Sequence, residues 1–324
     1  MEMRVVGNTG LQVSRLGLGT MTWGRDTPAN RAKEVLKTYL DAGGNLLDSA
    51  AAYGHGAAEK TIGELLSGYA RRDDVVIATK AGFVSRGRER RVDTSRSAML
   101  ADLDASLRRL GTDHVDLWQV HAWGEAPLEE TLAAMDTAVT SGRVRYIGLS
   151  NFIGWQVATA ATWQRAFPGR TPVASAQVEY SLLARRAEVE ILPAVRANGL
   201  GFFPWSPLGR GVLTGKYRQS IPRGSRGAGH FSWFVEPYLQ QRSRGVVEAV
   251  VRAAEGLDLT PLQVALIWVR DAPGVTAPLL GAHSSSQLDE CLGAEGYTLP
   301  AEICSALDDV SGGPLAARGD AAGH

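Results

Sequence analysis

The fold is decided by residues 115–149, which read Val115-Asp-Leu-Trp-Gln-Val120, a helical pattern over Pro127–Ser141, and Val144-Arg-Tyr-Ile-Gly-Leu149. Two parallel strands joined by a crossover helix require this alternation. Short apolar runs of this kind occur eight times, at Leu16–Gly19, Asn45–Asp48, Val75–Thr79, Val115–Val120, Val144–Leu149, Val173–Gln177, Gly201–Trp205 and Val275–Leu280. Helical patterns also lie at Ala32–Leu40, Ser97–Leu110, Trp155–Phe167, Arg185–Ala197, Gly245–Gly256 and Pro261–Val269. The eightfold repeat predicts an α/β fold, the (β/α)8 or TIM barrel.

Two segments lie outside this repeat. Arg4-Val5-Val6 and Leu11-Gln12-Val13, joined by a Gly-Asn-Thr-Gly turn, predict an N-terminal β-hairpin that covers the barrel floor. Arg218–Ser243 predicts a long loop between strands 7 and 8, a length typical of functional lids. No linker divides the chain, so we expect residues 1–324 to form a single domain.

The composition favours a small-molecule partner. The 324 residues carry 34 Lys and Arg against 34 Asp and Glu, so no net charge attracts nucleic acid or an anionic membrane. The start Met1–Gly10 lacks the apolar core of a signal peptide, and no apolar run is long enough for a membrane span, which predicts a cytoplasmic protein. Cys291 and Cys304 provide no disulfide framework and no metal-ligand spacing, so we expect two thiols and no metal.

Polar residues close or follow the predicted strands. In a (β/α)8 barrel, the carboxyl ends of the strands form the mouth at which chemistry takes place. Each of these side chains also has an ordinary explanation, such as a helix cap or a satisfied buried histidine. Their coincidence at successive strand ends favours a site. They are Asp48, Lys80, His121, Ser150, Asn151 and Gln177.

Tyr53, in the turn that follows Asp48, adds a candidate acid. A phenol ionises near pH 10, but an ammonium about 4 Å away contributes about 4 kcal/mol at an effective dielectric constant of about 20. Lys80 therefore has the charge to bring Tyr53 into a catalytic range. Asp48 has the charge to keep Lys80 protonated, since a lysine desolvated alone tends to lose its proton.

Several motifs, in order along nearly the whole chain, resemble the aldo-keto reductase superfamily: Asp48-Ser-Ala-Ala-Ala-Tyr53-Gly-His-Gly-Ala-Ala-Glu59, Ala78-Thr-Lys80, Asp116-Leu-Trp-Gln-Val-His121, Tyr146-Ile-Gly-Leu-Ser-Asn151 and Gln177-Val-Glu-Tyr-Ser181. The resemblance implies a (β/α)8 barrel that reduces an aldehyde or ketone to an alcohol with a nicotinamide cofactor. It also implies a catalytic tetrad of Asp48, Tyr53, Lys80 and His121. Tyr53 would donate the proton and His121 would orient the carbonyl oxygen.

The same resemblance implies the cofactor site. NADP(H) is favoured over NAD(H), although His283 stands where an arginine is common and Cys291 where an asparagine is usual. A histidine offers a full charge to a phosphate only when protonated, so the preference should weaken as pH rises. The predicted contacts are Gly19, Thr20, Met21, Asp48, Ser150, Asn151 and Gln177 near the nicotinamide; Trp205 stacked on it; Ser206, Pro207, Leu208, Gly209, Arg210, Lys216 and Arg226 at the pyrophosphate; and Gly281, His283, Gln287, Glu290 and Cys291 at the adenosine end.

For the substrate, Trp23 and Trp123 predict an aromatic wall beside Tyr53 and His121, to which Phe231 or Trp233 of the long loop can add. Packing against the barrel rim explains the same aromatic residues equally well. Two other functions compete with the reductase. One is a nicotinamide-binding regulatory or redox-sensing subunit related to potassium-channel β-subunits, which the tetrad fits as well. The other, a metal-dependent barrel hydrolase, is disfavoured because no His-x-His pair follows the first strand.

Overall fold

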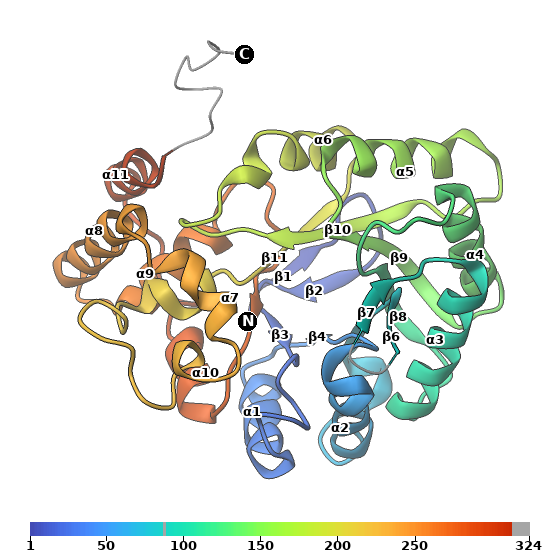
Figure 1. The fold of residues 1–324 in the computed structure, drawn as a ribbon, viewed down its shortest axis with the longest axis horizontal. Coiled ribbons are helices and arrows are strands. Elements are labelled where there is room, and N and C mark those ends of the chain that lie inside the picture. The colour runs from blue at the N-terminus through green and yellow to red at the C-terminus, as the bar shows by residue number, and fades with distance from the viewer. Residues whose placement is uncertain (87–88, 313–324) are drawn as a thin grey trace.

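Eight parallel strands close into a barrel in this computed structural model, which describes residues 1–86 and 89–312 (Figure 1). Their order around the barrel follows the chain, and the last strand pairs with the first. The predicted (β/α)8 fold is thereby confirmed. The barrel strands are β3 (Gly17–Gly19), β4 (Leu46–Asp48), β5 (Val76–Ala81), β8 (Val115–Val120), β9 (Val144–Ser150), β10 (Val173–Glu179), β11 (Gly201–Trp205) and β12 (Leu279–Leu280).

Helices surround the strands, as Figure 1 shows. Their buried faces join the outward side chains of the strands in one large apolar core. Thr260 caps one of these helices through the capping box that its sequence predicts, with Pro261 in the first turn. The α-helices are α1 (Ala29–Asp41), α2 (Ala57–Leu66), α3 (Arg96–Leu110), α4 (Leu128–Thr140), α5 (Gly154–Ala166), α6 (Ile191–Ala197), α7 (Ser232–Val235), α8 (Gln241–Leu257), α9 (Pro261–Arg270), α10 (Ser285–Leu292) and α11 (Ala301–Ser311). The short 3-10 helices are η1 (Tyr53–Gly56), η2 (Arg72–Asp74), η3 (Arg186–Glu188), η4 (Gly209–Thr214), η5 (Arg226–Ala228) and η6 (Glu236–Tyr238).

The N-terminal hairpin closes the floor of the barrel, as predicted. Its strands are β1 (Met3–Val5) and β2 (Gln12–Ser14), which pair antiparallel. The backbone N–H of Asn8 bonds to Gly199 just before β11, and that of Ser14 bonds to the side chain of Asn45 just before β4. The hairpin therefore lies at the amino ends of the strands. Val6, Leu11 and Val13 pack with the inward side chains of the barrel, so the opposite end is left for a site.

The structure departs from the predicted elements in three places. The eighth strand pairs only at Leu279–Leu280 instead of over Val275–Leu280, because Pro278 has no N–H for the ladder. The helix predicted over Arg185–Ala197 is divided into η3 and α6, and Pro193 lies in the first turn of α6, where proline is tolerated. The sequence did not predict α2, α10, α11 or the hairpin of β6 (Phe83–Arg86) and β7 (Glu89–Val92).

The segment Arg218–Ser243, which follows β11 and η4, contains η5, α7, η6 and the first residues of α8. It is therefore a connection with helical turns of its own, and its residues reach the barrel mouth described below. In the part of the chain that the structure describes, no helix combines the length and the apolar character that crossing a membrane requires.

Candidate functional site

A buried ion pair lies at the centre of the barrel mouth. Asp48 ends β4 and Lys80 lies near the end of β5, and the two strands are neighbours. Lys80 Nζ donates to Asp48 Oδ2 at 2.7 Å and to the carbonyl oxygen of Ser49 at 2.7 Å. It also lies 3.4 Å from the hydroxyl of Tyr53. Three of the four predicted tetrad residues are thus joined by hydrogen bonds.

Burial and charge act in opposite directions on Lys80. Burial lowers the pKa of this ammonium, while the Asp48 carboxylate and the Tyr53 side chain raise it, and the balance leaves the pKa above its ordinary value. The second oxygen of Asp48 accepts from Gln177 Nε2 at 2.8 Å and from Gln119 Nε2 at 3.5 Å. Lys80 therefore remains a cation beside Tyr53, and Asp48 is fully occupied in holding it there.

A tight turn presents Tyr53 to the mouth. Tyr53 begins η1, and the next three residues, Gly54, His55 and Gly56, all have left-handed backbone angles, with φ of 57°, 55° and 90°. Glycine adopts this conformation without strain, whereas His55 does so at a cost. The turn allows α2 to begin at Ala57, directly behind the phenol.

His121, which follows β8, faces Tyr53 across the mouth. The two ring centroids are 5.8 Å apart, with ring planes at 79°. Phe83 also packs edge-on against the imidazole, with the two ring centroids 4.6 Å apart. The structure therefore brings all four predicted catalytic residues into one group, with two potential proton donors facing the same space.

Asn151 links three strand ends beside this group. Its φ is 57°, and its Nδ2 donates to the carbonyl oxygen of His121 at 2.9 Å and to Ser150 Oγ at 3.2 Å. Its Oδ1 accepts the indole N–H of Trp205 at 3.0 Å. Thr20 is tied to the same rim, because its N–H and hydroxyl both bond to the carbonyl oxygen of Asp48. Polar groups from β3, β8, β9 and β11 thus converge where the sequence places a nicotinamide.

Arg210 holds the long loop against the barrel. Its guanidinium forms a bidentate pair with Glu179 at 2.8 and 2.7 Å and also bonds to the carbonyl oxygen of Phe234. The same group lies over the rings of Phe234 at 3.7 Å and Tyr238 at 4.8 Å. Phe234 in turn stacks near Trp205, with centroids 6.3 Å apart. The charge of the Arg210 side chain is therefore paired with Glu179, although the backbone of Arg210 still lies in the segment predicted to bind the pyrophosphate.

Other cations gather near the start of α10. Burial lowers the pKa of His283, and the charges of Arg226, Lys216 and Arg31 lower it further, while Asp26 opposes them. The His283 Nδ1 bonds to Thr27 Oγ1 at 2.9 Å, and its backbone N–H donates to Gln287 Oε1. Within residues 1–86 and 89–312, neither Lys216 nor Arg226 forms an ion pair. Such a cluster of cations suits a phosphate.

The residues predicted to contact the adenosine end of the cofactor lie partly at the surface and partly in the core. Gly281 and Glu290 are exposed, and Ser284 caps α10 by accepting the N–H of Gln287. Cys291 is different, because its side chain is only 4% exposed and packs in the apolar core. Burial raises the pKa of its thiol to about 12. The expectation that Cys291 contacts the cofactor is not supported, because the helical turn directs this residue inward.

The aromatic wall is only partly where the sequence places it. Trp123 packs edge-on against Phe152 at 5.3 Å and Trp155 at 5.2 Å, and Trp155 is 55% exposed. Trp23, in contrast, has no exposed surface and lies in the core. The next residue, Gly24, has a φ of 72° and turns the segment against α2. The expectation that Trp23 borders the substrate is therefore not supported.

The two aromatic residues of the long loop also differ from each other. Phe231 lies under the guanidinium of Arg25, 4.8 Å from its ring centroid. Trp233 is 65% exposed and packs edge-on against Phe234. Among the residues that the structure describes, no group of three or more His, Cys, Asp or Glu side chains is arranged to hold a metal ion.

Sequence reasoning missed several residues of the site. Gln119 lies two residues before His121 on β8, and Glu179 lies two residues after Gln177 on β10. Strand alternation directs such pairs to the same face, so this spacing was the available signal. Phe83 and Phe234 had no such signal, because they belong to the hairpin of β6 and β7 and to the short helix α7, both outside the barrel strands.

Comparisons with known proteins agree with this geometry. A family model described as "Aldo/keto reductase family" matches residues 15–311. "Uncharacterized oxidoreductase YrpG" of Bacillus subtilis (strain 168) is 38% identical over 97% of this chain and 97% of its own length. "Aldo-keto reductase YhdN" of the same organism is 31% identical, covering 93% and 91%. "Probable voltage-gated potassium channel subunit beta" of Arabidopsis thaliana is 33% identical, covering 90% of each chain.

Proposed function

The chain belongs to the Aldo/keto reductase family, and on that premise we propose that it is an NADPH-dependent reductase that converts an aldehyde or a ketone to an alcohol. The observation that carries the proposal is the contact of Lys80 Nζ with both Asp48 and the Tyr53 hydroxyl, opposite His121. A fixed cation beside a phenol favours release of the phenolic proton. This arrangement suits proton donation to a carbonyl oxygen that gains negative charge.

The residues at the mouth fit a nicotinamide dinucleotide. Lys216 and Arg226, and His283 when it is protonated, provide positive charge near the N-terminus of α10, where a phosphate is favoured. Asn151, Ser150 and Gln177 offer amide and hydroxyl groups, and Trp205 offers a flat apolar surface. A bound reduced nicotinamide supplies a hydride to the carbonyl carbon. These side chains would hold the cofactor.

The protein's own part in the reaction concerns the carbonyl oxygen. Tyr53 donates its proton to this oxygen, and Lys80 stabilises the resulting phenolate across 3.4 Å. His121 orients the same oxygen by hydrogen bonding. Asp48 keeps Lys80 charged and in place, helped by the amide of Gln177. Trp123 and Trp155, backed by the buried Phe152, offer an apolar surface to the remainder of the substrate.

The test is a panel of aldehydes and ketones supplied with NADPH and, separately, NADH. We expect loss of the reduced-nicotinamide absorbance with some members of the panel and a larger kcat/KM with NADPH. Tight NADPH binding without turnover of any carbonyl would instead favour a regulatory or redox-sensing subunit. The similarity to the plant protein named as a probable potassium channel subunit beta supports that second candidate. We expect a small-molecule partner and a cytoplasmic location for either.

A further inference from the structure

A buried carboxylate on α2 has no part in the proposed mechanism. The Glu59 side chain has no exposed surface. Thr79 Oγ1 donates to its Oε1 at 2.5 Å, and Arg109 of α3 donates to its Oε2 through Nε at 2.7 Å. The Arg109 Nη2 lies 2.6 Å from the same oxygen. A carboxylate buried this deeply requires hydrogen-bond and ion-pair partners of this quality, so its position is closely defined.

Glu59 holds β5 from outside the barrel at the residue next to Lys80. Side chains alternate along a strand, so Lys80 and Ala78 face the barrel interior while Thr79 faces the helices. The bond from Thr79 to Glu59 therefore fixes the backbone from which the Lys80 side chain extends. Thr79 is itself fully buried, which leaves its hydroxyl little freedom to change partner.

The loop that carries Tyr53 is fastened to β5 at both ends. Before Tyr53, the backbone N–H groups of Ser49 and Ala51 bond to the carbonyl oxygens of Ala78 and Lys80. After it, Glu59 bonds to Thr79. Residues 49–59 are thus anchored to β5 on both sides of the left-handed turn, and the phenol is held over the strand that supplies Lys80.

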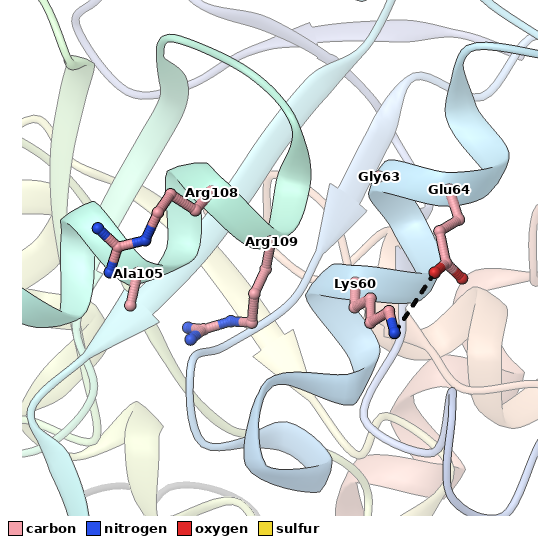
Figure 2. A pocket seen from close by; sticks show the side chains of 6 residues that line it. All are labelled: Lys60, Gly63, Glu64, Ala105, Arg108 and Arg109. Atoms are coloured by element: carbon pink, nitrogen blue, oxygen red, sulfur yellow. Dashed lines mark ion pairs between the residues drawn. The ribbon is translucent and has the colours of Figure 1, made fainter.

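Arg109 also covers the turn directly. A Cβ added at Gly56 would lie 2.5 Å from Arg109 Cδ and 2.6 Å from its Nε. The guanidinium therefore packs against the glycine that ends the Tyr53 turn and simultaneously pairs with Glu59. Figure 2 shows Arg109 on α3 beside Arg108, across the groove from Lys60, Gly63 and Glu64 of α2. One side chain thus joins the two helices and the turn.

We propose that Glu59, held by Arg109, is a positioning residue for the proton donor: through Thr79 it fixes the distance between Lys80 Nζ and the Tyr53 hydroxyl. The inference rests on the proposed role of Tyr53 as the acid. Asp102 of α3, whose carboxylate accepts the N–H of Gly82, is a further charged group near this pair. Loss of the bond to Thr79 lets Lys80 and Tyr53 move apart, so the phenol becomes a weaker acid.

Thr79→Val is the sharpest test, because it removes the hydroxyl without changing the charge. Thr79→Ser is the matched rescue, because it retains the hydroxyl. The ionisation of Tyr53 is measured in the full-length protein without cofactor, as the phenolate absorbance that disappears when Tyr53→Phe is added to the same background. For Thr79→Val we expect the midpoint to rise by about half a pH unit or more, and for Thr79→Ser to stay within about a quarter of a unit.

Kinetics provide the second measurement. In Thr79→Val we expect kcat near neutral pH to fall by about threefold for each half unit by which the midpoint rises, while KM for the carbonyl and Kd for NADPH change less than about twofold. Thermal unfolding identifies variants that lose their fold. If Thr79→Val does not fold, Arg109→Lys replaces it as the test, and the same change at the exposed Arg108 is the control (Figure 2). Arg109→Lys should raise the midpoint of Tyr53 ionisation, and Arg108→Lys should leave that midpoint unchanged.

A folded Thr79→Val protein with an unchanged Tyr53 midpoint overturns the proposal, even if its stability falls, because a merely structural contact predicts that result. So does an Arg109→Lys protein that behaves like Arg108→Lys. The proposed function fails separately: a protein that reduces no carbonyl of the panel can still show the shift in the Tyr53 midpoint.

Discussion

Replacing Lys80 by methionine tests the centre of the site most directly. The change removes the ammonium that lies 2.7 Å from Asp48 and 3.4 Å from Tyr53, and it preserves most of the apolar stem. Asp48 is then left as a buried carboxylate beside the amides of Gln177 and Gln119, without a cationic partner among the described residues. We expect both the stability and the chemistry of the protein to suffer.

The two losses have different sizes. Removing one partner of a buried ion pair costs about 3–5 kcal/mol, and the remaining amide bonds to Asp48 favour a value near 3 kcal/mol in the free energy of unfolding. For the chemistry, a unit charge 3.4 Å from the phenolate contributes about 5 kcal/mol at an effective dielectric constant of about 20. Asp48 opposes part of this effect, so we expect kcat near neutral pH to fall about 100-fold or more.

Denaturant unfolding and a pH profile of kcat measure the two losses. The pKa of Lys80 is raised in the folded protein, so its contribution to stability is fully present below the ordinary lysine pKa of about 10 and is lost only above it. Unfolding is therefore compared near pH 7. The alkaline limb of the kcat profile, where Tyr53 loses its proton, should move to higher pH.

Two further variants complete the experiment. Lys80→Met with Asp48→Asn removes the stranded charge, so it should recover more than half of the lost stability and none of the activity. Lys60→Met, on the exposed face of α2, should change the stability by less than about 0.5 kcal/mol. If Lys80→Met is as stable as the parent protein, or if its alkaline limb does not move, the role assigned to the pair is refuted.

Three other predictions address the proton donor, the phosphate site and the long loop. Tyr53→Phe should abolish carbonyl reduction while NADPH binding, measured by quenching of tryptophan fluorescence, stays within about threefold; activity within about threefold of the parent contradicts this. Burial and Arg226 lower the pKa of His283 in the free protein, so the preference for NADPH over NADH should weaken as the pH rises above that lowered pKa and level off once the bound histidine has also lost its proton. His283→Arg should tighten NADPH selectively by about 1–2 kcal/mol, and a large, pH-independent preference in the parent protein excludes this role. Arg210→Met should increase chymotryptic cleavage within residues 218–243 about tenfold, whereas Arg223→Met should not; equal cleavage of the two variants contradicts the role of Arg210.

The barrel could be predicted because its signals are local. Each strand is a short apolar run, and each polar residue at its end is a few positions away in the sequence. Asp48, Lys80 and His121 therefore converge by topology alone once eight strands are counted. The predicted extent of the eighth strand was wrong for an equally local reason, because Pro278 interrupts the hydrogen-bond ladder in a run that is otherwise apolar.

Side-chain direction outside the strands could not be predicted in this way. Trp23 and Cys291 lie in segments that match a cofactor-binding family, yet the turn at Gly24 and the inward face of α10 bury both. The pairing of Glu59 with Arg109 joins residues 50 positions apart, on two helices of which only α3 was predicted. Such contacts depend on how helices pack around the barrel, which a pattern of apolar residues does not specify.

The ion pair of Arg210 with Glu179 changes which cations are left for the phosphates of the expected cofactor. The sequence assigns this arginine to the pyrophosphate, but its guanidinium is held by Glu179 and by the carbonyl oxygen of Phe234. The positive charge that remains for a dinucleotide comes from Lys216 and Arg226, whose side chains form no ion pair within the described residues, and from His283 when it is protonated. Proximity of Arg226 makes that protonation harder in the free protein, whereas a bound phosphate would favour it. We therefore expect selection of the cofactor to be coupled to uptake of a proton, which a permanently charged arginine at position 283 would not require.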